Sequence, residues 1–274
     1  MKGAADFKQM ALDALRGRWL LAVGTGFVAS LLGAGVATGG SSGSGSSESG
    51  SVSDLVKEIP EAEQWFRQLS VILGIAVVLL VVWGIVTLII GGAGKLGYAT
   101  FNLNLVDRRE AAFADLFSQF HRLGDGFCMN FLMGLYIFLW SLLFVIPGIV
   151  KGFSYAMTPY ILAENPGMTA TEAITESRRR MDGNKFRLFC LAFSFIGWEL
   201  LCAAPVLLAV VVVAGKIMAG GSAAVLLWLI PTGIPSFIGW LFLMPYIEAA
   251  YAAFYREISA EAAWAAQRTE STAW

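Results

Sequence analysis

The sequence predicts an all-α fold: a polytopic helical membrane bundle of about six spans in three hairpins, with amphipathic interfacial helices on the cytoplasmic side. The composition, a set of long apolar runs and the distribution of basic residues predict it. Of the 274 residues, 57% are hydrophobic and only 14% are charged, whereas soluble domains carry about 25% charged residues. The composition therefore indicates that lipid is the solvent for much of the chain.

Five apolar runs reach the length of about 20 residues that crosses a hydrocarbon core of about 30 Å. They cover residues 19–37, 69–93, 127–150, 186–214 and 223–255. Pro205 interrupts the fourth run, and the element 231–235, with a proline at each end, is predicted to break the fifth. A shorter apolar segment, 152–163, follows the pair 147–148 (Pro-Gly), which can break or turn a helix.

The first run is predicted to stay in the protein as a span. The alternative is a cleaved signal peptide, because Gly35-Val36-Ala37 resembles a cleavage site. The apolar part would be unusually long for a signal peptide, and four more runs follow. The chain is therefore predicted to be a single integral membrane domain, 1–274, with a flexible exterior Gly/Ser-rich loop at 39–68 and a cytoplasmic tail at 259–274.

The positions of Lys and Arg predict the orientation of the spans. The N-terminal segment and the segments 107–125 and 151–187 are basic, whereas the loop 39–68 carries more acids than bases. If both internal basic segments face the cytoplasm, an even number of crossings separates them, so residues 149–163 must return across the membrane. This predicts six crossings with both termini cytoplasmic. Five crossings, with one basic loop outside, is the alternative.

Three stretches on the predicted cytoplasmic side have helical periodicity. Their apolar stripes are Phe7, Met10, Ala11, Ala14 and Leu15; Phe113, Leu116, Phe117 and Phe120; and Ala170, Ala173, Ile174, Ser177 and Met181. The third has a capping box, Thr169 with Glu172, and a stop signal at Gly183. Such helices either lie in the membrane interface or dock on the ends of the bundle, and the sequence leaves both open. Each precedes a pair of spans, which indicates three copies of one unit.

Two short patterns resemble catalytic or cofactor motifs. Residues 92–97 match G-x-G-x-x-G, but they end a membrane span instead of a strand, so we interpret the match as chance. Residues 39–43 match G-x-S-x-G within low-complexity sequence, and the single histidine, His121, lies on the other side of the membrane. The three cysteines lie in apolar runs. We therefore predict no catalytic site, no cofactor and no metal site.

Glu199 is the candidate intramembrane polar residue, with Lys151 and Asn130 beside it as further candidates. An ionisable residue inside a span is costly and usually faces the bundle interior or water. At about 20 Å beyond residue 186, Glu199 is expected past the middle of the membrane, with Lys151 as a candidate partner. Two interpretations remain: a neutral, hydrogen-bonded structural glutamate, or a member of an ion, proton or substrate path.

A basic cluster precedes the fourth run and consists of Arg178, Arg179, Arg180, Lys185 and Arg187. Such clusters set topology and attract anionic lipid, each residue by about 1 kcal/mol. These residues are the candidates for binding a lipid headgroup or a partner. The net charge of −1 gives the chain no overall basic excess of the kind that nucleic-acid binding calls for, so no nucleic-acid partner is expected.

Residues 139–198 contain L-W-S-L-L, I-P-G-I, P-Y-I-L-A-E, E-A-I-T-E-S-R and S-F-I-G-W. These motifs resemble the bacterial membrane-protein family called domain of unknown function 975, which is allied by fold to a membrane domain associated with some glycerophosphodiester phosphodiesterases. Further matches at 15–19, 97–98, 115–117 and 245–255 extend the resemblance to nearly the whole chain outside the Gly/Ser loop and the last dozen residues. The resemblance implies an integral membrane protein of a bacterium with no established activity. Glu199 departs from the family pattern, which calls for an apolar residue there.

The predicted function is therefore a non-enzymatic membrane scaffold, regulator or partner- or lipid-binding module in the bacterial cytoplasmic membrane. Membrane lipids are the expected partners, and a membrane-protein partner is left unidentified. The alternative is a transporter or lipid-handling protein, because spans broken by proline can line a cavity.

Overall fold

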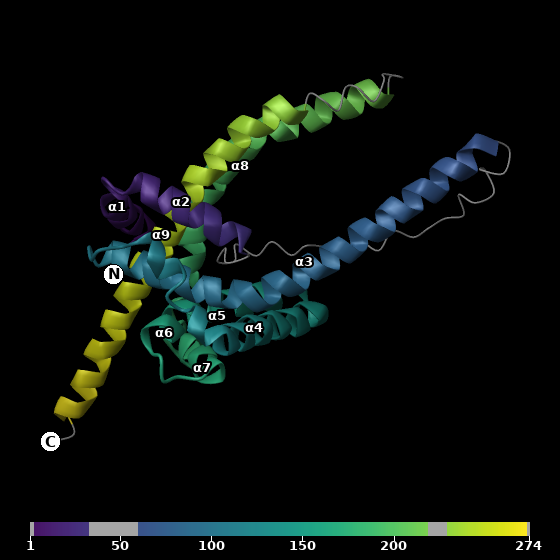
Figure 1. The fold of residues 1–274 in the computed structure, drawn as a ribbon. Helices are drawn as coiled ribbons and strands as arrows, with labels where there is room; N and C mark the ends of the chain where they lie inside the picture. Colours follow the sequence, from purple (N-terminus) through teal and green to yellow (C-terminus); the bar gives the residue numbers. More distant parts are fainter. Residues whose placement is uncertain (1–2, 33–59, 219–228, 273–274) are drawn as a thin grey trace.

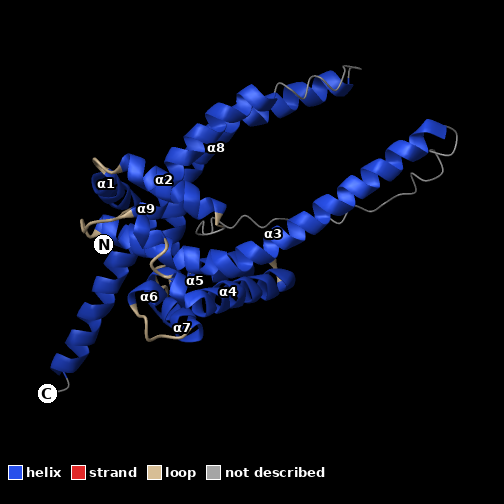
Figure 2. Cartoon of the chain, viewed as in Figure 1, coloured by secondary structure: helices blue, strands red, loops and turns tan. Residues whose placement is uncertain are grey.

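The computed structural model describes residues 3–32, 60–218 and 229–272, and the elements within them are all helices (Figure 2). In chain order these are α1 (Ala4–Leu15), α2 (Trp19–Leu31), α3 (Pro60–Val106), the 3-10 turns η1 (Phe113–Leu116) and η2 (Phe120–Arg122), α4 (Leu123–Leu143), α5 (Val145–Tyr155), α6 (Thr158–Glu164), α7 (Ala170–Arg180), α8 (Lys185–Met218) and α9 (Leu229–Thr272). The all-α prediction is confirmed for these residues.

Several helices are long and apolar enough to cross a membrane. Three stretches meet this description by themselves: Phe113–Leu143, Lys185–Lys216 and Pro231–Trp264. A fourth arises if the bent pair Leu73–Thr87 and Ile89–Val106 is one span, and Trp19–Leu31 is apolar but shorter. These lengths and compositions are those of an integral membrane protein, as the composition predicted.

The breaks between helices differ from those that the sequence predicted. The chain turns at Phe144, whose extended backbone (φ −158°, ψ 146°) separates α4 from α5. Pro147 instead lies in the first turn of α5, where a proline costs no helical hydrogen bond. Helix α8 continues through Pro205, and α9 continues through Pro235 and Pro245. The predicted break at 231–235 is therefore wrong; apolar surroundings tolerate proline within a long helix.

The helices form one densely packed region, from which α3, the α4–α5 pair and the α8–α9 pair project to one side and the end of α9 projects to the other (Figure 1). We call the dense region the packed base; its buried side chains come from α1, η1, α6, α7 and residues 93–105, 188–195 and 243–258. We call the apolar projecting parts the arms: residues 71–90 of α3, residues 131–150 of α4 and α5, and residues 196–218 of α8 with residues 229–242 of α9. Large apolar side chains cover the arms and are exposed, as Leu142 (78%) and Val211 (68%) illustrate.

Two of the three apolar stripes lie on α-helices that dock in the packed base. On α1, Phe7 is 1% exposed and meets the ring of Phe254 with centroids 5.2 Å apart. On α7, the whole predicted stripe is buried, and the predicted capping box of Thr169 and Glu172 is present. The docking interpretation is thus confirmed for both helices.

The second stripe does not form an α-helix. Residues 113–122 make the two 3-10 turns, with Leu116 buried and with Phe113 and Phe117 more than 40% exposed. The first and third copies of the predicted unit pass from their short helix to the next one through a left-handed glycine, Gly17 (φ 76°) or Gly183 (φ 77°). In the second copy the corresponding Gly126 lies inside α4. The glycine turn that the predicted repeat places after its short helix is therefore present at Gly17 and Gly183 and absent at Gly126.

Glycines let α3 approach its neighbours closely. A Cβ on Gly92 would lie 2.1 Å from the carbonyl oxygen of Gly126 in α4, and a Cβ on Gly97 would lie 2.0 Å from that of Leu116 in η1. Only glycine allows backbones this near to one another. The G-x-G-x-x-G pattern at 92–97 thus has a packing role, in line with its interpretation as a chance match.

The predicted domain boundaries shift slightly. Helix α3 begins at Pro60, so residues 60–68 of the predicted loop are helical, and residues 39–59 lie outside the described residues. At the other end α9 continues without a break to Thr272, so the predicted tail from 259 is an extension of that helix as far as the structure describes it.

Candidate functional site: ion pairs of the packed base and a groove between α8 and α9

Three of the five predicted headgroup-binding cations are in ion pairs within the packed base. Arg179 makes two hydrogen bonds of 2.8 Å to Glu176. Arg180 donates to the same carboxylate at 2.7 Å and to Ser259 of α9 at 2.9 Å. Arg187 donates to two acids of α9, Glu257 at 2.6 Å and Glu261 at 3.1 Å. The contacts of Arg180 and Arg187 fasten α7 and α8 to α9 and leave these two guanidinium groups little capacity for a headgroup, whereas the Arg179 pair lies within α7 and its side chain is 73% exposed.

The other two predicted cations are more available. Lys185 lies 3.7 Å from Asp182, whose side chain is largely exposed. Arg178 is exposed and forms no ion pair with any residue that the structure describes. The sequence pattern could not make this distinction, because it depends on which acids of α9 and of α7 face each cation.

Glu176 is the acid that pairs with two arginines of α7. Its hydrogen bond with Arg179 and its contact with Arg180 lower the pKa of Glu176 to about 2, against the opposing effect of burial. The carboxylate is therefore charged at any physiological pH. It pairs with two of the three consecutive arginines, of which Arg180 is turned toward the protein and Arg179 is largely exposed.

Arg256 of α9 joins the end of α3 to the end of α6. Its guanidinium donates to Asp107, which follows α3, and to Glu164, the last residue of α6. Glu164 also accepts a hydrogen bond of 2.6 Å from Tyr255. One cation of α9 thus bridges an acid that follows α3 and an acid at the end of α6.

A second set of polar side chains lies deeper in the packed base. Glu248 of α9 is 1% exposed, and the hydroxyl of Tyr160 donates to it at 3.4 Å. Lys95 of α3 is close enough to Glu248 to interact with it electrostatically, and it donates to Asn130 of α4 at 2.7 Å. Asn130, a predicted candidate, therefore belongs to this set and not to the surroundings of Glu199.

The sequence pattern did not lead us to single out Glu248 and Lys95, although both meet the criterion that identified Glu199. Each is an ionisable residue within or at the end of an apolar run, which is the criterion that singled out Glu199. Near Lys95 and Glu248, the hydroxyl of Tyr98 is buried without a hydrogen-bond partner among the described residues. The packed base therefore contains polar groups that only the meeting of α3, α4, α6 and α9 brings together.

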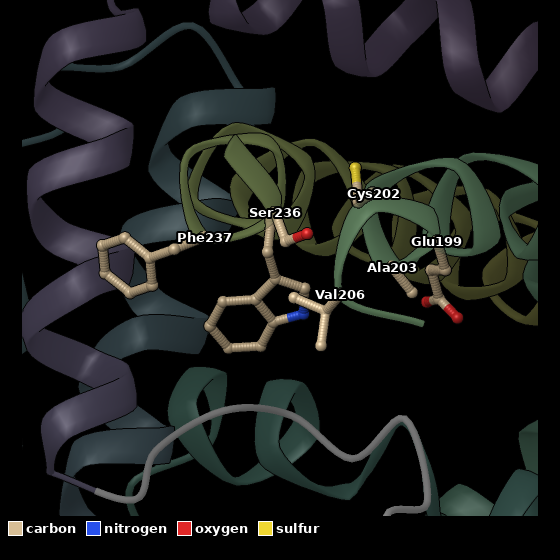
Figure 3. Close-up of a pocket in the computed structure, with 7 residues that line it drawn as sticks. Glu199, Cys202, Ala203, Val206, Ser236 and Phe237 are labelled. Carbon is tan, nitrogen blue, oxygen red and sulfur yellow. The ribbon is translucent and has the colours of Figure 1, made fainter. Parts of the chain in front are cut away.

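Glu199 lines a groove of about 360 Å³ between α8 and α9 (Figure 3). The other lining residues are Cys202, Ala203 and Val206 of α8 and Ser236, Phe237 and Trp240 of α9. Glu199 is near enough to Tyr251 to act on it electrostatically. Lys151, its predicted partner, is elsewhere: its ammonium lies 4.7 Å from the centre of the Trp140 ring, and no ion pair joins it to Glu199 in the described structure.

Residues 143–262 match the family described as Protein of unknown function (DUF975). The matching stretch runs from the last residue of α4 into α9, and it includes the ion pairs of Arg180, Arg187 and Arg256 as well as the groove. The match supports the resemblance of this part of the chain to a family of unknown function. No curated protein and no solved structure matches the chain.

Proposed function

We propose that the protein is a non-enzymatic integral membrane module of a bacterial cytoplasmic membrane, with six crossings and both termini cytoplasmic. In this proposal the arms and the parts of the helices next to them lie in the membrane, and the ion-paired end of the packed base forms the cytoplasmic part that binds lipid headgroups or a membrane-protein partner. The observation that carries it is the division of the molecule into arms with exposed apolar side chains and a base with nearly all the ion pairs. The sequence motifs alone support an alliance with the membrane domain of some phosphodiesterases.

The α4–α5 hairpin supports a sixth crossing at residues 149–163. Arg122, at the start of α4, donates a hydrogen bond of 3.0 Å to the carbonyl of Leu162, near the end of α6. The chain thus leaves and returns to the same place, with its turn at Phe144. Because α4 has 21 residues and rises about 1.5 Å per residue, the outward path is about 30 Å, close to the thickness of a hydrocarbon core. Residues 145–162 retrace that distance.

Labelling of single cysteines with a membrane-impermeant maleimide tests the crossings. The three native cysteines are replaced by serine, and one cysteine is introduced as Ile146→Cys at the hairpin turn or as Gly167→Cys after α6. Ile146 is 75% exposed and Gly167 has open space around it. We expect intact cells to label the first and not the second, which should react only after permeabilisation. Labelling of Gly167→Cys in intact cells would overturn the six-crossing proposal in favour of five.

The headgroup-binding part of the proposal is tested by lipid retention. Purified protein is loaded with a mixture of phosphatidylglycerol and phosphatidylcholine in a non-ionic detergent, and bound lipid is counted by native mass spectrometry. We expect the double variant Arg178→Ala, Lys185→Ala to retain less phosphatidylglycerol. Arg179→Ala is the matched control, because its guanidinium is already paired with Glu176. Equal retention by all three proteins would remove lipid binding from the proposal.

A transport or lipid-handling role is the second candidate, and the groove at Glu199 is the observation that favours it. It requires that Glu199 act on a bound molecule. An unchanged phenotype or transport activity in Glu199→Gln would exclude it.

A further inference from the structure

The groove between α8 and α9 has one charged group and no counter-charge. Glu199 is the only ionisable acid or base among its seven lining residues. No ion pair or hydrogen bond within the described residues involves its carboxylate. An isolated carboxylate on a membrane-embedded helix is costly, and the cost falls when a cation neutralises it.

A second polar group lines the same groove without a partner. The hydroxyl oxygen of Ser236 is buried and has no hydrogen-bond partner among the described residues. Figure 3 shows this hydroxyl on the α9 side of the groove, pointing toward α8, which carries Glu199. A serine hydroxyl accepts as well as donates, and leaving it unpaired costs about 1–3 kcal/mol. Because Phe195 and Cys202 of α8 face Tyr246 and Gly239 of α9, Ser236 is level with Pro205, about 9 Å along α8 from Glu199. Glu199 is therefore the acceptor that a small cation in the groove meets.

The rest of the lining is apolar. Val206, Phe237 and Trp240 border the polar groups. Beyond the groove, the neighbouring side chains Leu207, Val210 and Ile238 are about half exposed on the surface of the arm. The volume of about 360 Å³ suits a small headgroup and not a whole lipid. A ligand with one polar end in the groove could therefore lay an apolar chain along the arm, and the aromatic rings favour a cation at that end.

We propose that this groove binds the ammonium group of a long-chain amine or of an aminolipid. The ammonium donates to Glu199, and its chain lies on the apolar surface of α8 and α9. An anionic headgroup is disfavoured because it would face the carboxylate with no cation beside it. This inference rests on the proposed membrane location of α8 and α9, and it adds a ligand class that the proposed function leaves unspecified.

Equilibrium binding of radiolabelled dodecylamine to the full chain in a non-ionic detergent at pH 7 tests the proposal. We expect saturable binding, with dodecanol and dodecanoate binding at least tenfold more weakly. Glu199→Gln should weaken dodecylamine binding about tenfold, because it removes a charge-assisted hydrogen bond. Glu110→Gln, at an exposed acid outside the groove, is the matched control and should bind as the wild type does.

Ala203→Phe provides a test that leaves Glu199 in place. The larger side chain fills the groove, so dodecylamine binding should be lost while the far-UV circular dichroism stays that of the wild type. Non-saturable binding, or equal binding of dodecanol, or unchanged binding in both Glu199→Gln and Ala203→Phe, would overturn the proposal. Because binding is measured in detergent, its failure is separate from failure of the maleimide test of topology.

Competition then distinguishes the two sources of the ammonium group. Phosphatidylethanolamine that displaces dodecylamine from the wild type, and not from Glu199→Gln, identifies an aminolipid as the ligand. Displacement only by shorter alkylamines identifies a free hydrophobic amine.

Discussion

The packed base and the arms are made from the same helices but are stabilised differently. In α3, Leu105 is 1% exposed in the base, whereas Leu79 is 63% exposed in the arm (Figure 1). In α9, the alanines at 249–250 and 252–253 are fully buried, whereas Phe237 is 51% exposed. The base holds small side chains, aromatic contacts and ion pairs, and the arms hold long apolar side chains with few neighbours. A single helix can therefore pass from a protein interior to a surface suited to lipid within a few turns.

The difference has a physical reason. In lipid, apolar side chains gain little by packing on one another, because lipid tails are as apolar as leucine. In the base, polar groups can be hydrated by water or by lipid headgroups instead of bonding to one another. Close packing and paired charges therefore decide the structure there. The base is therefore where substitutions should change stability, and the arms are where they should not.

Substitution of Gly97 has the largest expected effect on the free energy of unfolding. An alanine there would put Cβ 2.0 Å from the carbonyl oxygen of Leu116 and force η1 away from α3. We expect Gly97→Ala to lower the free energy of unfolding by about 3 kcal/mol or more, measured by thermal unfolding in detergent. Gly84→Ala in the arm of the same helix is the matched control, because nothing lies within 4 Å of its Cβ position. Equal stability of the two variants would break the comparison.

Truncation of leucine in α3 gives the next effect. Leu105→Ala should cost about 3 kcal/mol, since it leaves a cavity in the base. Leu79→Ala should cost less than about 0.5 kcal/mol, since detergent or lipid fills the space. Chemical unfolding of both variants, followed by tryptophan fluorescence, provides the measurement. A large loss in Leu79→Ala would mean that the arm is packed against protein.

The variant Arg256→Ala tests whether ion pairs hold α9 to the ends of α3 and α6. Arg256→Ala leaves Asp107 and Glu164 facing each other without the cation, so we expect a loss of about 2 kcal/mol in the free energy of unfolding. Limited proteolysis should show faster cleavage of the segment between α3 and α4. Arg178→Ala, at an exposed cation, is the control and should change neither quantity. An unchanged proteolysis pattern in Arg256→Ala would show that packing alone joins α9 to α3 and α6.

Substitution of Glu176 has the smallest expected effect on the free energy of unfolding, and this effect depends on pH. Its pKa is lowered from 4.5 to about 2, so the stabilisation by its pairs with Arg179 and Arg180 is present above about pH 4.5 and is lost as the pH falls toward 2. Glu176→Gln should cost about 1 kcal/mol at pH 7. The gap between the wild type and the variant should narrow between pH 4.5 and pH 3 in thermal unfolding. A gap that stays constant over this range would assign the effect to packing.

Much of the fold could be predicted because it depends on local patterns. The capping box at Thr169 and the glycine stop at Gly183 are fixed by backbone geometry, and the apolar runs by composition. The helix break near 147–148 could not be placed, because Pro147 suits the first turn of a helix as well as it suits a break. Continuity through Pro235 was missed for a related reason: in an apolar environment a proline need not end a helix.

The candidate site was less predictable than the fold. Glu199 was found because it interrupts an apolar run, and the groove that it lines needs α9 as well as α8. The basic cluster was found as a group, but its division into paired and available cations depends on acids some 70 residues later, such as Glu257. The packing of α9 against α3 and α6 buries Glu248, and no local pattern encodes that packing.

The sequence by itself determined that this chain is helical and suited to a membrane, since composition, run length and helix-capping signals are properties of neighbouring residues. Only the tertiary structure decided that the amphipathic helices α1 and α7 dock in a packed base, that Arg256 joins α9 to the ends of α3 and α6, and that Glu199 and Ser236 line one groove. These features depend on contacts between residues far apart in the chain, and helical periodicity is the same whether a helix covers lipid or protein.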